Sequence, residues 1–214
     1  MILTLKQVKK DLYAADFVIL RGDMQVGTMR LQGSMGQEHG NVFIEYNGHS
    51  YTMRRMPRKS SLKEIFTTAG PFKPCEIIED GHKIAHLYYD QCIKINRWAS
   101  STVCKLFYGG SEYWMYFVGR GYEKPHDPIY KDNEQIALIE IDNVIYDGMR
   151  VYTLYGITDE DAFLALLYAC YIYRCAGYEA GQKVIKGVSK SYTRTKHQII
   201  LDKLTPNFCE NITP

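Results

Sequence analysis

Short runs of strand-forming residues alternate with two-residue turn signals over the first two thirds of the chain. The clearest signal is Asn47-Gly48, which lies between two runs rich in β-branched and aromatic residues. Such a pair between strand formers is the strongest short-range indication of a β-hairpin. Asp80-Gly81 and Asp147-Gly148 repeat the pattern, so we expect a meander of antiparallel strands. The predicted strands cover residues 16–20, 25–31, 41–46, 49–53, 75–79, 82–89, 93–98, 102–108, 113–118, 136–146 and 149–155.

The hydrophobic pattern changes after this series. Residues 162–173 are twelve consecutive apolar or aromatic residues, so a helix formed by them has no polar face and must be covered on every side. Thr158 can cap its N-terminus, and the acids at 159–161 suit the positive end of the helix dipole. Arg174 and Gly177 supply a C-terminal stop. A membrane span needs about 18 to 20 apolar residues, so we expect an internal helix.

The order of these elements indicates how they combine. A wholly apolar helix that follows many strands is most simply accommodated inside a closed or nearly closed sheet, because closure also removes exposed strand edges. We therefore expect one β-barrel domain over residues 1–178, with the enclosed helix near 159–176, and a basic extension over 179–214. Ser61 and Glu64 resemble a capping box and predict a short helical connection near residues 59–66.

Composition narrows the classes of function. A formal net charge of +2 is nearly balanced and does not create the global field typical of nucleic-acid binding, so no nucleic-acid partner is predicted. The first ten residues lack the apolar region and cleavage site of a signal peptide, which favours a cytoplasmic protein. Six cysteines are scattered without CxxC spacing, a pattern that favours reduced, structural thiols over a disulfide or metal site. No metal site and no cofactor are expected.

The serial hairpins at Asn47-Gly48, Asp80-Gly81 and Asp147-Gly148, followed by the apolar helix over 161–174, resemble the tubby C-terminal-like superfamily. That superfamily includes the LURP-one-related proteins and the phospholipid scramblases. The resemblance covers residues 16–173 and implies a mainly β fold, an antiparallel closed barrel of about twelve strands that encloses a C-terminal hydrophobic helix. Tubby proteins bind phosphoinositides and scramblases are lipid-associated, so the resemblance also implies a lipid-linked function. The sequence shows neither the scramblases' terminal membrane segment nor a motif that aligns with the tubby lipid site, so no binding residue is transferred.

The densest basic cluster lies at the exit of the first strong hairpin. Each cation near an anionic surface contributes about 1 kcal/mol of attraction, so a loop of this kind can hold an anionic headgroup. The alternative is a solvated loop whose charges are balanced by Glu64 and other acids. The predicted headgroup-binding residues are Arg54, Arg55, Arg58, Lys59 and Lys63.

A second basic series lies in the extension, where Lys183, Lys186, Lys190, Arg194 and Lys196 would form one stripe if this segment were helical. Intervening glycine, serine and threonine residues oppose that helix, so a loosely ordered or differently docked tail is the favoured alternative. His126-Asp127 resembles an acid–base pair, but neighbouring residues in a proline-flanked loop commonly point apart.

These observations favour a non-catalytic binding module. The preferred partner is an anionic phospholipid or a membrane surface, which would place the cytoplasmic protein peripherally at a membrane. The alternative is a protein-interaction or scaffold role, in which the tyrosine-rich exterior or the tail contacts a protein partner. A hydrolase that uses His126, Asp127 or a cysteine is the least favoured reading.

Overall fold

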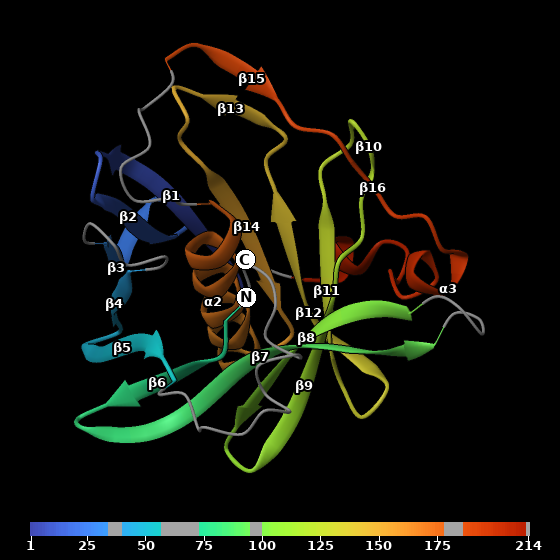
Figure 1. Cartoon of the computed structure of the whole chain (residues 1–214), viewed down its shortest axis with the longest axis horizontal. Helices are drawn as coiled ribbons and strands as arrows, with labels where there is room; N and C mark the ends of the chain where they lie inside the picture. Colours follow the sequence, from blue (N-terminus) through green and yellow to red (C-terminus); the bar gives the residue numbers. More distant parts are fainter. Residues whose placement is uncertain (34–39, 57–72, 95–99, 178–185, 213–214) are drawn as a thin grey trace.

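Twelve antiparallel strands form a closed barrel in a computed structural model that describes residues 1–33, 40–56, 73–94, 100–177 and 186–212. Around the barrel the strands follow the order β1-β14-β12-β11-β9-β8-β7-β6-β5-β4-β3-β2, and β2 pairs with β1 to close it (Figure 1). Their bounds are β1 Ile2–Lys10, β2 Ala14–Arg21, β3 Met24–Gln32, β4 Asn41–Tyr46, β5 His49–Arg55, β6 Cys75–Glu79, β7 His82–Lys94, β8 Ser100–Tyr108, β9 Ser111–Tyr116, β11 His126–Lys131, β12 Glu134–Ile141 and β14 Val151–Gly156.

The predicted hairpins at Asn47-Gly48 and Asp80-Gly81 are confirmed, whereas the strand before Asp147-Gly148 pairs with residues 188–190 instead of with β14. Asn47 and Gly48 have φ values of 49° and 83°, and Asp80 and Gly81 have φ values of 48° and 79°. Both central residues therefore adopt the positive φ that a type I′ turn requires. Because the strands are joined by such short turns, sequence neighbours become sheet neighbours, and the meander is built almost entirely from local signals.

Three predictions about the strands are wrong, and one of them is the proline-flanked loop around His126 and Asp127, which is barrel strand β11. The strands begin at Ile2 rather than near residue 16, and β1 closes the barrel by pairing with both β2 and β14. Leu3, Leu5 and Gln7 of β1 point inward and are buried, an alternation that is visible in the sequence but lacks a preceding turn signal. The predicted strand over 136–146 divides at Ile141, because the chain then leaves the barrel as β13 (Val144–Tyr146).

The apolar segment forms α2 (Asp159–Ile172), and every side chain from Ala162 to Ile172 is buried. The predicted cap is confirmed: Thr158 Oγ1 accepts a hydrogen bond from the Asp161 amide at 3.2 Å, and the Asp161 carboxylate accepts one from the Thr158 amide at 3.0 Å. These reciprocal bonds satisfy amides that the first helical turn leaves free. The N-terminus of the helix is therefore set by its own sequence.

Side chains from separate parts of the barrel surround this helix. The rings of Tyr46 and Tyr51 lie 5.6 and 5.0 Å from the ring of Phe163, between centroids. On another side, the Tyr168 hydroxyl donates to the carbonyl oxygen of Tyr113 at 2.8 Å. Since β4, β5 and β9 all contact it, the helix fills the barrel rather than covering its outside (Figure 1).

The predicted C-terminal stop is wrong for Arg174. The chain continues from α2 into a π-helical turn, η1 (Tyr173–Gly177), and the Arg174 side chain is fully buried instead of meeting solvent at the helix end. A basic residue near the end of a helix normally indicates favourable interaction with its dipole at the surface, and nothing in the sequence marked this one as internal. Within the described ranges, no helix combines the length and apolar character needed to cross a membrane.

The segment after residue 185 docks on the outside of the barrel in short pieces. β15 (Val188–Lys190) pairs with β13, and β16 (Thr193–Arg194) pairs with β10 (Arg120–Gly121) (Figure 1). A short helix, α3 (Gln198–Leu201), buries Ile200 against Val103, Tyr116 and Val118, and a 3₁₀ turn, η2 (Phe208–Asn211), follows. The described part of this segment therefore does not form one basic helix, and the favoured alternative of a differently docked tail is confirmed there.

Candidate anion-binding site

The structure places the predicted headgroup-binding residues only in part. Arg54 and Arg55 lie at the end of β5 and are exposed, whereas Arg58, Lys59 and Lys63 lie outside the described residues. Arg54 is opposite Glu76 in the β5–β6 pairing, and its Nε donates to Glu76 Oε1 at 2.8 Å. An opposite-charge pair across two strands neutralises this arginine. We call Arg54, Arg55 and Glu76 the β5–β6 edge.

A second group of cations is assembled by the docked tail. Gly119 is the point of closest approach: a Cβ atom there would lie 2.5 Å from Thr193 Cγ2 and 2.8 Å from the Thr193 carbonyl oxygen. The Gly119 amide donates to Thr195 Oγ1 at 2.8 Å, and the Thr195 amide donates to the Gly119 carbonyl oxygen at 2.8 Å. Glycine thus lets the tail lie directly against the barrel, which positions the residues on either side of Thr195.

This docking sets two arginines opposite each other. Arg120 of β10 and Arg194 of β16 are register partners in an antiparallel pair. Directly opposed side chains point to the same face with Cβ atoms about 5 Å apart, and like charges in this position are destabilising. Both arginines are exposed, and within the described ranges neither forms an ion pair. The pair therefore creates a positive site that the described protein leaves uncompensated.

Both arginines open into one cleft of about 770 Å³, which we call the tail cleft. Lys196 adds a third cation to its wall, and none of the lining residues is acidic. The cleft is formed by Gly119, Arg120, Gly121, Tyr192, Arg194, Thr195, Lys196, Gln198 and Leu201. Three cations in a concave surface concentrate positive potential more strongly than the same charges on a convex one.

Exposed aromatic rings border the tail cleft. Tyr122 and Tyr192 are 58% and 55% exposed, and their ring centroids lie 4.9 Å apart in an edge-to-face contact. The ammonium group of Lys190 lies 5.2 Å from the centre of the Tyr122 ring. Tyrosines of this kind present an apolar ring and a polar hydroxyl together, which suits contact with an interface between water and lipid headgroups.

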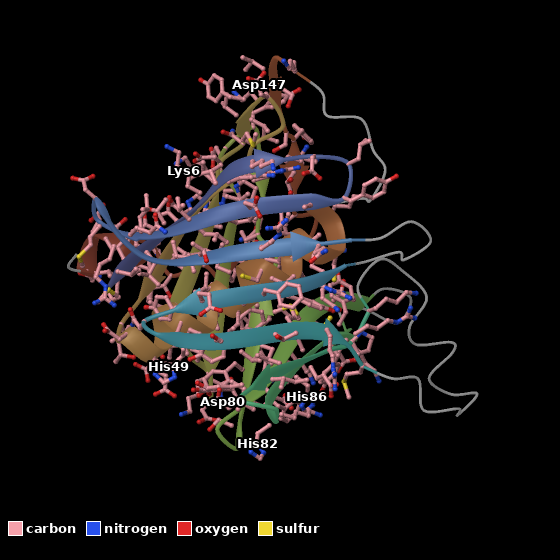
Figure 2. The ribbon with its side chains drawn as sticks, turned by 90° about the vertical axis from the view of Figure 1, so that its left-hand side faces the viewer. Lys6, His49, Asp80, His82, His86 and Asp147 are labelled. Carbon is pink, nitrogen blue, oxygen red and sulfur yellow. The ribbon has the colours of Figure 1, made fainter. Side chains whose placement is uncertain are left out.

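The β13–β15 pair extends this surface beyond the barrel. Figure 2 shows Asp147 at the top of the molecule, where the turn after β13 projects, and Figure 1 shows β15 beside β13 at the same end. The Asp147 carboxylate accepts from the Gly187 amide at 2.7 Å, so it holds the tail at this tip. Tyr146 and Val188 are 64% and 68% exposed there. Such exposed apolar side chains beside cations are typical of an interaction surface.

His126 and Asp127 do not form an acid–base pair, because each side chain contacts a different partner. His126 Nε2 lies 3.0 Å from Glu140 Oε1, and this contact is the main reason that the pKa of Glu140 is lowered. Cys209 Sγ also contacts Glu140 at 3.7 Å, but burial raises the pKa of this thiol to about 11. A nucleophilic cysteine needs the opposite shift, so this cluster does not activate one.

Asp127 points into the barrel wall, where its carboxylate accepts from the Val118 amide at 3.2 Å. Burial raises the pKa of Asp127 to about 7, against the lowering effects of this hydrogen bond and of His126. The side chain is 3% exposed, so it cannot reach a substrate on the surface. His82 and His86 both lie on β7. They do not form a metal site, since no described group of three histidine, cysteine or acidic side chains could hold a metal ion.

Comparison of the chain with models of known protein families, with curated proteins and with solved structures finds no match. The resemblance to the tubby C-terminal-like superfamily stays a prediction.

Sequence reasoning recognised Lys190, Arg194 and Lys196 as cations but not the site they form with Arg120. One available signal was charge asymmetry: residues 180–201 contain five lysine or arginine residues and no acid. The partner on the barrel had no such signal, because Arg120 is a lone cation between two glycines. Only the pairing of β10 with β16 shows that these segments meet.

Proposed function

We propose that this protein is a non-catalytic binding module that attaches peripherally to anionic membrane surfaces through the tail cleft. The observation that carries the proposal is the direct opposition of Arg120 and Arg194, with Lys196 beside them and no acidic side chain in the cleft wall. Two opposed arginines cost stability in the free protein. A phosphate group between them removes the repulsion and accepts several charge-assisted hydrogen bonds.

The surroundings of the cleft favour a membrane over an isolated phosphate. Tyr122 and Tyr192 border it, and Tyr146 and Val188 lie exposed at the β13–β15 tip. On a membrane, cations near the headgroups each contribute about 1 kcal/mol, and apolar side chains add to this by entering the interface. The predicted lipid-linked function of the resembled superfamily agrees with this proposal but does not identify the residues.

The test is sedimentation of the purified chain with vesicles of phosphatidylserine and phosphatidylcholine, compared with vesicles of phosphatidylcholine alone, at low and high salt. We expect binding to the anionic vesicles only, and a large loss at high salt because salt screens exposed charges. The variant Arg120→Ala/Arg194→Ala/Lys196→Ala should bind about 100-fold more weakly, since it loses three cations worth about 1 kcal/mol each.

A matched control removes three charges elsewhere. Lys9, Arg30 and Lys83 are exposed cations that do not line the cleft, and the first two are paired with Asp11 and Asp16. Their triple alanine variant should keep most of the binding. Equal losses in both variants would contradict a specific site. Binding to neither vesicle would favour the protein-interaction alternative.

A further inference from the structure

Arg174 occupies an unusual place for a permanently charged residue. Its guanidinium is fully buried where α2 passes into η1. Nε donates to the Gly40 carbonyl oxygen at 2.7 Å, Nη1 donates to Cys75 Sγ at 3.2 Å, and Nη2 is buried without a hydrogen-bond partner. No described carboxylate lies within ion-pair distance of it.

A buried charge without a counter-ion is costly, and arginine does not give up its proton in proteins. Among the described residues, the thiols of Cys75, at the start of β6, and Cys175, in η1, are ionisable groups beside Arg174, and they form a hydrogen bond with each other. One negative charge on this pair compensates the guanidinium. The position of Arg174 therefore favours a thiolate inside the barrel.

The two thiols have different roles. The Cys75 proton has two acceptors in reach, the Lys73 carbonyl oxygen at 3.3 Å and the Cys175 sulfur. Its pKa is raised by its hydrogen bond with Cys175 and by burial, although Arg174 acts against this. The pKa of Cys175 is lowered, first by that same bond and further by Arg174, although burial opposes the shift. The hydrogen bond from the Cys75 thiol to the Lys73 carbonyl oxygen keeps a proton on Cys75, and this geometry points to Cys175 as the sulfur that carries the charge.

The other buried cysteines show that burial alone does not lower the pKa of a thiol. Burial raises the pKa of Cys104 and of Cys170, and neither is within hydrogen-bond distance of the guanidinium in the described structure. A thiol of raised pKa is a poor nucleophile, whereas a thiolate next to an arginine is the reactive form.

We propose that Cys75 and Cys175 form a reversible oxidation site that links β6 to the end of the central helix. The oxidant is hydrogen peroxide. The Cys175 thiolate attacks one peroxide oxygen, the O–O bond breaks, and Cys175 becomes a sulfenic acid while hydroxide departs. Cys75 then attacks that sulfur, the S–O bond breaks, and a disulfide forms. The departing oxygen and the Cys75 proton leave as water. Two thiols are oxidised and one peroxide is reduced.

The disulfide would tie down the helix inside the barrel. Cys75 and Cys175 stand 100 positions apart in the sequence, and closing so long a loop strongly restricts the unfolded chain. We expect oxidation to raise the unfolding temperature by about 10 °C. Cys75 is fully buried and Cys175 is only 4% exposed, so hydrogen peroxide should react faster than oxidised glutathione, which is too large to reach the thiolate.

The experiment treats the reduced full chain with hydrogen peroxide, blocks remaining thiols, and analyses the chain by peptide mass spectrometry without reduction. The expected product is a peptide pair joined through Cys75 and Cys175, with the rise in unfolding temperature reversed by dithiothreitol. Cys75→Ala and Cys175→Ala should each abolish both signals. Cys209→Ala, which removes a half-buried thiol whose side chain contacts Glu140, should leave both unchanged.

Peroxide treatment of the unmodified chain tests the proposal even if a variant fails to fold. Peroxide treatment that leaves Cys75 and Cys175 as free thiols, while the protein stays folded, would overturn the proposal. So would a disulfide that joins either residue to another cysteine. Arg174→Gln, where it folds, should slow formation of the linked peptide at least tenfold, because the thiolate loses its counter-charge.

Discussion

The β5–β6 edge and the tail cleft are both basic, but the cations in them have different neighbours. At the edge, Arg54 faces Glu76 across two strands and is paired with it at 2.8 Å. In the cleft, Arg120 faces Arg194. At the edge the charge of Arg54 is neutralised by an ion pair within the fold, whereas the charges in the cleft remain available to bind an anion. Strand register, more than the number of basic residues in a run, decides which basic segment is available for binding.

The largest effect on this comparison is expected from a change that moves the cleft cations without removing them. Gly119→Val introduces side-chain atoms where Thr193 packs, so β16 should detach and carry Arg194 and Lys196 away from Arg120. Affinity for phosphatidylserine vesicles should fall about 30-fold, as expected from the loss of two cations worth about 1 kcal/mol each. Hydrogen exchange of the Thr195 amide reports the detachment. Unchanged affinity with a detached tail would show that the docked geometry is irrelevant.

A smaller effect is expected from removing one of the opposed arginines. Arg194→Ala should weaken vesicle binding about fivefold and at the same time raise the free energy of unfolding by up to about 1 kcal/mol, because the repulsion with Arg120 disappears. Vesicle sedimentation and thermal unfolding measure the two quantities. Arg194→Lys keeps the charge and is the matched control. A variant that loses both affinity and stability would contradict the opposed-charge interpretation.

At the β5–β6 edge we expect a substitution to increase the affinity for anionic vesicles instead of decreasing it. Glu76→Gln releases Arg54 from its ion pair, so affinity for anionic vesicles should rise by up to about fivefold, as expected for one newly available cation. Stability should fall by about 1 kcal/mol or less, since the pair is partly exposed. Glu134→Gln removes an exposed acid outside the edge and controls for net charge. An equal rise in both variants would attribute the gain to net charge alone.

The smallest effect on binding is expected from Arg54→Ala. Because its charge is already paired, the affinity for anionic vesicles should change less than about twofold, while stability falls by about 1 kcal/mol from the lost pair. The predicted cluster of Arg54, Arg55 and Arg58 is tested in the same assay by its triple alanine variant. If this variant loses as much affinity for anionic vesicles as the triple alanine variant of the tail cleft, the binding site lies at this cluster.

The barrel could be predicted because the sequence signals that specify it, the turn residues between strands, act between neighbouring segments. Pairs such as Asn47-Gly48 demand positive φ values and join neighbouring strands, so the order of the sheet follows the order of the sequence. The helix was equally clear, since twelve apolar residues in a row admit no exposed face. β1 was missed because it pairs with β14, the last barrel strand in the sequence, and no turn residue predicts a contact between such distant segments.

The candidate site was recognised only in part for the same reason. The tail cations were visible, but Arg120 and Arg194 meet through a two-residue strand pair that neither segment specifies by itself. Likewise, the position of Arg174 suggested the surface end of a helix, and its burial depends on Gly40 and Cys75, which are distant in the sequence. Charges held by long-range packing leave little trace in a single sequence.

The most direct test of the central claim locates the ligand on the unmodified protein. The isotopically labelled full chain is titrated with dihexanoyl phosphatidylserine below its critical micelle concentration, and amide chemical shifts are followed by NMR. The account predicts the largest shifts at residues 119–121 and 192–196, which form the tail cleft, and small shifts at Arg54 and Arg55. Shifts concentrated at the β5–β6 edge, or none at the cleft, would contradict it.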